Sequence, residues 1–480
     1  MAHELSLLLR DGRTPEPVDL RLRDGIVVER GPHLWPEPGE RVLDLAGRYV
    51  RRGLRDAHAH VVEWARAQRE TDLSGARSAV AAAELVARAD GRGLLRGGGF
   101  RDTGWPDRPS AGLLDRAAPG RAVVLRSRDM HSLWLSSAAL ALAGLPGHPT
   151  GLLQEHEAWD ALARLPAHRD ADDDDAVAGA VAAAHRRGLT AVRDFSFEQS
   201  HPAWARRQRE AGGRLPLRVE AVVQPDLLAS YVDRGLATGD GDAFLTVGPL
   251  KLFADGSLGS RTARCLTPYA GTDDRGLRLL DPEQLRRALE QARAARFAVA
   301  VHAIGDEATR DALHALQGAG VPSSIEHAQL LRPADLPLFA RGGVTASLQP
   351  AHLLDDAGAV DDLWRGTPSI PYAVRSLVEA GARVVLGSDA PVSPLDPWRS
   401  IAAAVHRTDG TAPAWRPAEA VPLELALQAS GARRPRPGDA ADLVVLAEPP
   451  YALSAADLAA IPVHATFVGG RCVHGPWAQD

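Results

Sequence analysis

Two histidines stand two residues apart in the segment Asp56-Ala57-His58-Ala59-His60. If this segment is a strand, Asp56, His58 and His60 share one face, because alternate residues of a strand point the same way. Two imidazoles on one face form a suitable pair of ligands for a transition-metal ion. A bare HxH spacing is a weak signal. The interpretation of the two histidines as metal ligands therefore depends on ligand-type residues elsewhere in the chain.

Three further residues of metal-binding type each end a short apolar run. The runs are 299–302, 324–327 and 384–389, and the residues that end them are His302, His327 and Asp389. In barrels of alternating strands and helices, the active site lies at the C-terminal ends of the strands. Any one of these residues is explained equally well as a strand-end polar group that a loop satisfies. It does not explain why all three residues stand at the ends of such runs.

The chain contains a single lysine, Lys251, among 55 lysine and arginine residues. It lies in the apolar segment 249–255, and burial shifts the pKa of an ammonium group toward the neutral amine. A neutral amine can add CO₂ to form a carbamate, an anion able to bridge two metal ions, whereas arginine stays protonated. The alternative is a salt bridge from Lys251 to Asp255 or another carboxylate, which an arginine would form equally well.

The middle of the chain alternates short apolar runs with helical stretches. Eight runs are expected to be strands, around 53–60, 189–195, 217–223, 248–255, 298–302, 324–327, 344–348 and 384–389. Strands that alternate with helices indicate an α/β fold with a parallel sheet, and eight of them close a (β/α)₈ TIM-type barrel. The long gap after the first run predicts an inserted subdomain at about 62–165.

Both ends of the chain contain short strand-like segments in place of the strand–helix alternation. They include 18–22 and 26–29, which flank an Asp24-Gly25 turn, and 441–446, 464–468 and 471–473 near the C-terminus. Asp-Gly between alternating segments is a strong hairpin signal. We therefore expect one small composite β-sandwich domain from residues 1–50 and 431–480, with the barrel spanning 51–430. Two separate edge hairpins are the alternative.

Composition excludes several classes of protein. A formal net charge of -6 argues against a nucleic-acid partner, which a basic excess would favour. No run of 18 or more apolar residues appears, so no membrane-spanning helix is expected. Cys265 and Cys472 lack a CxxC spacing and predict no disulfide framework. Because the N-terminus also lacks a secretory signal pattern, we expect a cytoplasmic protein. A homo-oligomer is compatible with the sequence.

Four segments resemble the amidohydrolase superfamily, specifically its amidohydrolase 3 (YtcJ-like) branch, which includes N-substituted formamide deformylases. They are Lys251-Leu-Phe-Ala-Asp-Gly-Ser-Leu-Gly-Ser-Arg-Thr-Ala263, Val301-His-Ala-Ile-Gly-Asp306, Ile325-Glu-His-Ala-Gln-Leu-Leu331 and Gly387-Ser-Asp-Ala-Pro-Val392. The resemblance covers nearly the whole chain. It implies a barrel with a composite β-domain, a divalent metal and hydrolysis of C–N bonds.

The resemblance also implies a role for each ligand-type residue. His58 and His60 would hold the more buried ion with Asp389, a carboxylated Lys251 would bridge, and the second ion would be held by His302 and His327. One or two ions per chain are expected, and zinc suits these ligands, with iron, manganese, cobalt or nickel as alternatives. Asp389 would also act as the catalytic base.

The inserted region carries the expected substrate contacts. The segments 125–134 and 151–155 resemble family segments, so His131 and Glu155 are expected to reach over the metals, with His131 donating to the developing oxyanion. A surface histidine and a solvated glutamate are the alternatives. Trp134 and Arg261 are further candidates for substrate binding, and Trp105 and Phe253 for walls of the pocket, although such aromatic residues more often lie in a core.

These observations predict a metal-dependent hydrolase that cleaves a C–N, amide-type bond of a small molecule with a metal-activated water. Hydrolysis of an ester or a cyclic amide is one alternative. A non-catalytic regulatory protein on the same fold is another, because fold does not imply function. The full set of ligand-type residues disfavours this second alternative.

Overall fold

The computed structural model describes residues 6–90, 93–166, 170–197 and 199–478. Its centre is a sheet of eight parallel strands in the order β20-β18-β16-β15-β14-β13-β12-β6. The strands are β6 Leu54–Ala59, β12 Leu189–Asp194, β13 Arg218–Val223, β14 Leu245–Phe253, β15 Val299–Ala303, β16 Ser323–His327, β18 Thr345–Leu348 and β20 Arg383–Leu386. Each of the eight expected runs overlaps one of these strands, so the predicted barrel is confirmed. Residues 247–252 of β14 are buried without alternation, as in parallel strands covered on both faces.

The barrel closes between its first and last strands. The Asp389 N–H donates to the His58 carbonyl at 2.6 Å. The Asp56 carboxylate accepts from the N–H groups of Ser388, at 3.0 and 3.2 Å, and of His58, at 3.0 Å. A Cβ atom at Gly387 would lie 2.6 Å from the His58 nitrogen, so only glycine permits this close approach. Asp56 therefore holds the barrel seam together, and burial raises its pKa to about 6.

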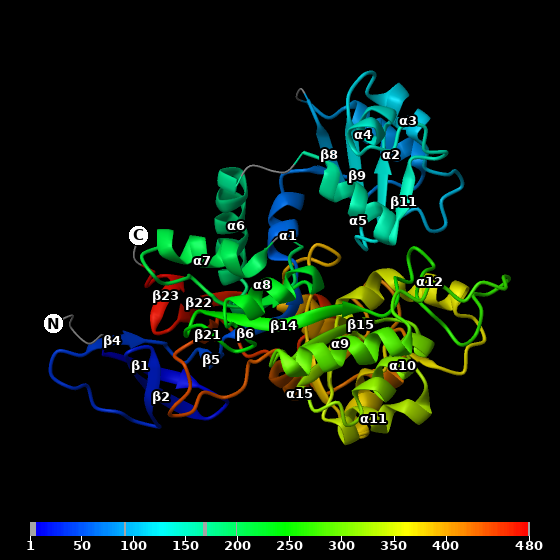
Figure 1. Ribbon diagram of the computed structural model, residues 1–480. Helices are drawn as coiled ribbons and strands as arrows, with labels where there is room; N and C mark the ends of the chain where they lie inside the picture. The colour runs from blue at the N-terminus through cyan, green and yellow to red at the C-terminus, as the bar shows by residue number, and fades with distance from the viewer. Residues whose placement is uncertain (1–5, 91–92, 167–169, 198, 479–480) are drawn as a thin grey trace.

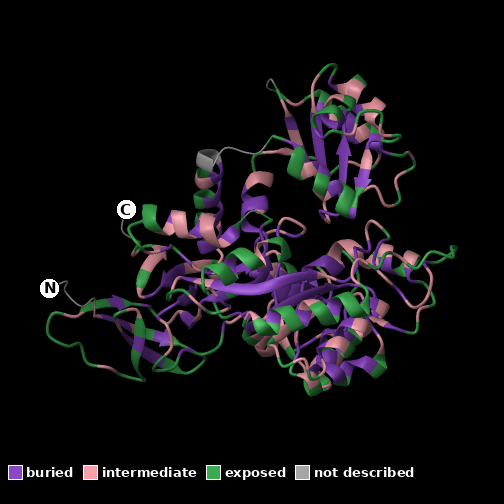
Figure 2. Cartoon of the chain, viewed as in Figure 1, coloured by how far each residue is buried: buried purple, intermediate pink, exposed green. Residues whose placement is uncertain are grey.

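Helices surround the sheet and bury their apolar faces against it (Figures 1 and 2). They are α1 Val61–Ala67, α6 Asp170–His185, α7 Ser200–Glu210, α8 Leu228–Asp233, α9 Pro282–Ala294, α10 Asp306–Leu316, α11 Leu336–Gly342, α12 Leu353–Leu363, α13 Val374–Glu379, α14 Pro397–His406, α15 Leu423–Ala429 and α16 Ala455–Ala459. At the start of helix α9, Asp281 and Gln284 form a capping box, which satisfies backbone N–H groups of the first turn. None of the helices in the described part of the chain has the length and apolar character needed to cross a bilayer.

The insert forms a separate layer, the cyan body of Figure 1. Its five-stranded sheet has the order β11-β10-β9-β8-β7, with β7 Thr71–Asp72, β8 Leu95–Phe100, β9 Val123–Ser127, β10 Ser132–Leu135 and β11 Leu152–Gln154. Its helices are α2 Ala79–Ala87, α3 Ala111–Ala117, α4 Ser137–Leu142 and α5 Glu155–Arg164. Helix α1, inside the range expected for the insert, lies beside α6 next to the barrel (Figure 1).

Both chain ends contribute to a third sheet. Its order is β23-β22-β21-β5-β1-β2-β3, and β4 pairs with β1. The strands are β1 Leu7–Arg13, β2 Pro17–Arg23, β3 Ile26–Gly31, β4 Arg41–Asp44, β5 Tyr49–Arg52, β21 Leu443–Leu446, β22 Val463–Val468 and β23 Arg471–His474. Since β5 pairs with β21, the two ends form one unit rather than two hairpins. Hydrogen bonds join its strands in one mixed sheet, where two sheets of a sandwich were expected.

Candidate metal centre

The six ligand-type residues meet at one end of the barrel. All six are buried, and all six line one cavity. They come from five strands or the residues that follow them: β6 and its end, β14, β15, β16 and the loop after β20. These residues are His58, His60, Lys251, His302, His327 and Asp389. The strand ends thus bring together side chains that are as much as 331 positions apart in the sequence.

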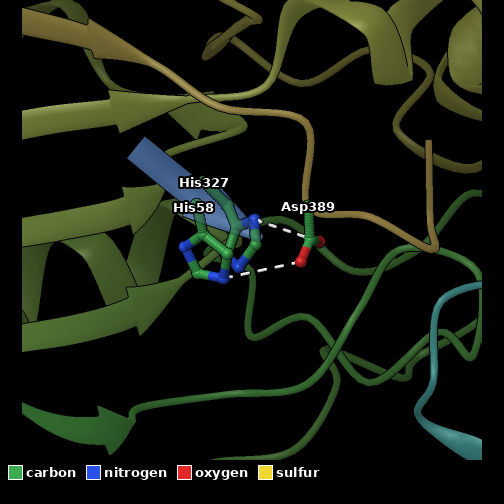
Figure 3. Close-up of side chains that lie close together, drawn as sticks. All are labelled: His58, His327 and Asp389. Atoms are coloured by element: carbon green, nitrogen blue, oxygen red, sulfur yellow. Dashed lines mark ion pairs between the residues drawn. The ribbon is translucent and has the colours of Figure 1, made fainter. Parts of the chain in front are cut away.

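The closest ligand atoms surround the Asp389 carboxylate. Its Oδ1 atom lies 3.4 Å from His58 Nε2 and 3.3 Å from His60 Nε2. One ligand atom each from His58, His327 and Asp389 lie within 4.8 Å of one another, and Figure 3 shows the two imidazoles beside the carboxylate. Two ligands about 2.1 Å from one ion at the tetrahedral angle lie roughly 3.4 Å apart. The observed spacing therefore suits one divalent ion.

Two of these atoms also lack a hydrogen-bond partner. Within the described residues, His58 Nε2 and Asp389 Oδ1 are buried and accept or donate no hydrogen bond. A buried polar atom without a partner is costly, and such atoms call for an explanation such as an ion. The convergence of both atoms on one point fits a bound cation. This donor set, imidazole and carboxylate, is one that zinc takes.

Outer hydrogen bonds orient the histidines. His58 Nδ1 donates to Glu326 Oε2 at 2.8 Å, and His327 Nδ1 donates to Gln349 Oε1 at 2.9 Å. Each bond leaves Nε2 as the free nitrogen, the arrangement found around metal-binding histidines. His302 is reversed, because its Nε2 donates to the Gly256 carbonyl at 3.1 Å and leaves Nδ1 free.

Burial also sets the charge of these imidazoles. It lowers the pKa of His58, His302 and His327 well below the usual range of histidine. The three rings are therefore neutral near pH 7, as a metal ligand must be. Burial acts in the opposite direction on Asp389, but the neighbouring His58 and His60 outweigh it and lower the pKa of Asp389 to about 2.

The backbone is strained at two of the ligands. His327 has φ 75° and Asp389 has φ 54°, both in the left-handed region. Such residues cost on the order of 1–3 kcal/mol each and cluster at functional sites. At His327 the turn of the backbone brings two consecutive side chains, Glu326 and His327, to the inside of the barrel. Regular alternation along β16 would have placed one of them outside.

Lys251 lies between two aromatic rings. Its Nζ atom is 4.7 Å from the centres of both Phe195 and Phe253, and its side chain is almost fully buried. No hydrogen bond or ion pair of Lys251 occurs within the described residues. Burial lowers the pKa of the amine to about 8, against the opposing charges of Glu326 and Asp389. Lys251 is thus a buried amine without a carboxylate partner.

Asp255, the alternative partner of Lys251, is engaged elsewhere. Its two oxygens accept hydrogen bonds from the backbone N–H groups of residues 264, 304 and 305, at 2.8, 3.0 and 2.8 Å. These bonds join the loop after β14 to the loop after β15. Asp255 therefore holds the two loops together, and the Lys251–Asp255 salt bridge, which was the alternative, does not form.

The insert places a charged histidine over the cavity. His131 lies in the cavity lining, and its ring centre is 5.3 Å from that of His302. Its Nδ1 donates to Glu155 Oε2 at 2.8 Å, while Glu155 Oε1 accepts from the Thr262 hydroxyl at 2.5 Å. Burial would lower the pKa of His131, but the Glu155 carboxylate outweighs it and raises that pKa to about 9. Both side chains are buried, so the surface alternatives are excluded.

Comparison with known proteins places these features in a family. The sequence profile described as "Amidohydrolase family" matches residues 41–474. The chain belongs to the amidohydrolase family. The assignment agrees with the resemblance seen in the sequence motifs, and it covers the whole barrel. Together with the structural neighbours described next, it supports a hydrolase.

Individual relatives extend along nearly the whole chain. The putative amidohydrolase YtcJ of Bacillus subtilis is 28% identical over 97% of this chain and 97% of its own length. An N-substituted formamide deformylase of Arthrobacter pascens is 26% identical over 90% of each chain. A solved structure, of an uncharacterized metal-dependent hydrolase from Pyrococcus horikoshii, has a TM-score of 0.78 and 25% identity. It covers 94% of this chain and 99% of its own.

Two expected substrate contacts of this amidohydrolase lie outside the cavity. Trp134 is fully buried in the core of the insert, with its ring centre 5.9 Å from that of Phe100. It packs between the sheet and helices of the insert, so the expectation that it binds substrate is wrong. Trp105 packs against the same core. Arg261 is exposed on a turn and is not among the residues that line the cavity.

Several cavity residues escaped the sequence analysis. Trp159 of α5 lines the cavity in the role expected of Trp134, alongside Phe253, which lies where it was expected. His352 follows β18, donates from Nε2 to the Ser388 carbonyl at 3.2 Å and lies 3.9 Å from Asp389. Its position after the seventh strand is a signal that could have identified it, because the other ligand-type residues also lie near or just after the C-terminal ends of strands.

Proposed function

We propose that this amidohydrolase hydrolyses a C–N bond of a small-molecule amide at a divalent metal centre. The observation that carries the proposal is the convergence of two buried ligand atoms without a hydrogen bond, His58 Nε2 and Asp389 Oδ1. An amide as the substrate is supported by the relative named an N-substituted formamide deformylase, which is similar over 90% of both chains.

The ligands divide into two groups around Lys251. In the proposed centre, His58, His60 and Asp389 would hold the more buried ion, and His302 and His327 would hold the second ion. We assign zinc, because imidazole and carboxylate are its usual ligands in hydrolases. Divalent ions bound there would lower the pKa of a water molecule and polarise the carbonyl of the amide.

Lys251 is proposed to bridge the two groups as a carbamate. The lone pair of neutral Nζ attacks the carbon of CO₂, a C–N bond forms while one C=O π bond opens and its electron pair moves to oxygen, and one proton leaves Nζ for water. The product carries a single negative charge on two oxygens. Support comes from the surroundings of Nζ, which lies between two phenyl rings and has no carboxylate partner among the described residues.

Asp389 and His131 act on the reacting groups. Asp389 accepts a proton from the attacking water and transfers it to the leaving nitrogen. Protonated His131 donates a hydrogen bond from Nε2 to the carbonyl oxygen as negative charge develops there. Glu155 holds the ring in place through Nδ1, and it also keeps the imidazole charged.

A metal titration and a substrate screen test the proposal. Protein purified without chelator should carry one to two equivalents of zinc by elemental analysis. Once reconstituted with zinc, it should hydrolyse at least one N-formyl amine, N-acyl amine or N-acyl amino acid. Asp389→Asn should abolish turnover, whereas Asp226→Asn, at an exposed position, should leave it unchanged. A protein that binds no divalent ion on titration would contradict the proposal.

A further inference from the structure

An apolar cleft of about 440 Å³ lies between the insert and the barrel. The larger aliphatic side chains that line it all come from the insert, and they are Val124, Leu133, Leu162 and Leu165. Three of these side chains are buried, and Leu162 is half-buried. The cleft is therefore lined by aliphatic carbon on the side of the insert.

The cleft borders the metal cavity. Met130, Trp159 and Phe197 line both spaces. Phe197 stacks on His60 with ring centres 5.0 Å apart, although 36% of its surface is exposed. Trp159 donates from Nε1 to the Met130 carbonyl at 3.4 Å. An aromatic pair, one ring from the barrel and one from the insert, thus lies at the boundary between the two spaces.

The two spaces differ in size. The metal cavity offers about 70 Å³, compared with about 440 Å³ in the cleft. One water molecule needs roughly 10–15 Å³ by the same measure, so the metal cavity has room for about five to seven waters. That room suits the carbonyl and one small substituent of an amide. A larger substituent must extend out of the metal cavity, and the shared aromatic residues lead into the cleft.

Charged side chains also line the cleft, and each of its three arginines has a protein partner. Arg66 binds the Asp173 carboxylate through two hydrogen bonds of 3.0 and 2.7 Å. Arg126 lies 3.7 Å from Glu70. Arg96 donates to the carbonyl of Pro166. Because each arginine has a protein partner, the cleft favours a neutral apolar ligand over an anion.

We propose that this cleft binds an extended apolar group, alkyl or aryl, of the amide whose carbonyl occupies the metal cavity. The proposal rests on the amide hydrolysis proposed above and narrows the substrate to amides with one small and one large apolar substituent. Burial of that substituent covers the exposed face of Phe197 and the leucine walls. Apolar surface removed from water is the source of the affinity.

Two homologous series of substrates test this assignment. N-alkylformamides vary the amine side, and N-methylamides of straight-chain acids vary the acyl side. In the series whose chain enters the cleft, kcat/KM should rise about fourfold per methylene. Ala163→Trp, on an exposed residue that lines the cleft, should remove this rise and leave the shortest substrate unaffected. Ala141→Trp, on an exposed residue of α4 outside the cleft, is the matched control.

A binding measurement separates the cleft from catalysis. The neutral fluorescent dye Nile red should bind the metal-loaded protein and be displaced by 1-octanol. Ala163→Trp should weaken displaceable binding at least tenfold relative to Ala141→Trp. If Ala163→Trp weakens dye binding in this way but the protein hydrolyses no amide, the cleft assignment stands and the proposed function is refuted. Equal binding in the two variants, or kcat/KM independent of chain length in both series, would overturn the cleft assignment.

Discussion

Glu326→Gln tests whether the outer hydrogen bond of His58 contributes to metal binding. The carboxylate accepts from His58 Nδ1 at 2.8 Å and is fully buried. A glutamine oxygen still accepts this bond, but it brings no negative charge to the imidazole. Loss of such an outer partner lowers metal affinity about 10- to 100-fold, which corresponds to about 1.4–2.7 kcal/mol. The fold itself should tolerate the change, because the substitution removes a buried charge and keeps the shape.

A competition titration measures this effect. Zinc affinity is determined for wild type and Glu326→Gln against a chromogenic chelator, with melting temperatures of both metal-free proteins as the measure of folding. Glu290→Gln, at an exposed position on α9, is the matched control and should bind zinc as wild type does. Unchanged affinity in Glu326→Gln would refute the role given to the His58–Glu326 pair. A large drop in the melting temperature of the metal-free protein would instead show that the carboxylate serves the fold.

Three further predictions concern single residues. Lys251→Arg should abolish activity because a guanidinium stays protonated, and Lys251→Ala should recover some activity with added short carboxylates; a fully active arginine variant would refute the carbamate. His131→Ala should lower kcat about 100- to 1,000-fold at constant metal content, whereas loss of metal would make His131 a ligand. Burial lowers the pKa of His185 to about 4, so the unfolded chain binds an additional proton below its own pKa of about 6.5. The free energy of unfolding therefore has its full value above pH 6.5, where His185 is neutral in both states. It falls by about 2–3 kcal/mol as the pH is lowered toward 4. His185→Gln should flatten this part of the profile of melting temperature against pH, and an unchanged profile would contradict the assignment.

The sequence was informative where position along a strand determines position in space. Eight apolar runs predicted the barrel, and the polar residues that end them predicted the cavity, because all parallel strands end at the same face. His58, His302 and His327 line the cavity for this reason. A single lysine in an apolar segment predicted a buried amine, which Lys251 is.

Sequence periodicity failed where the backbone or a second layer determines orientation. Glu326 could not be placed beside His58, since the left-handed backbone at His327 breaks the alternation of β16. Trp134 was misplaced because the insert has a core of its own. Its sequence pattern does not say which side chains face that core and which face the barrel. Trp159, which lines the cavity, lies on a helix whose rotation no local motif specifies.

The closing of the barrel seam has a consequence during synthesis of the chain. Asp56 and Ser388, which meet at the seam, are 332 residues apart. A ribosome adds about 5–20 residues per second, so roughly 17 to 66 s pass between the synthesis of the first barrel strand and that of the last. During that time the edge of β6 and the two histidines at its end have no partner from β20. The nascent barrel therefore stays open at the same place where its ligands must meet, and completion of the metal centre coincides with the end of translation of the barrel.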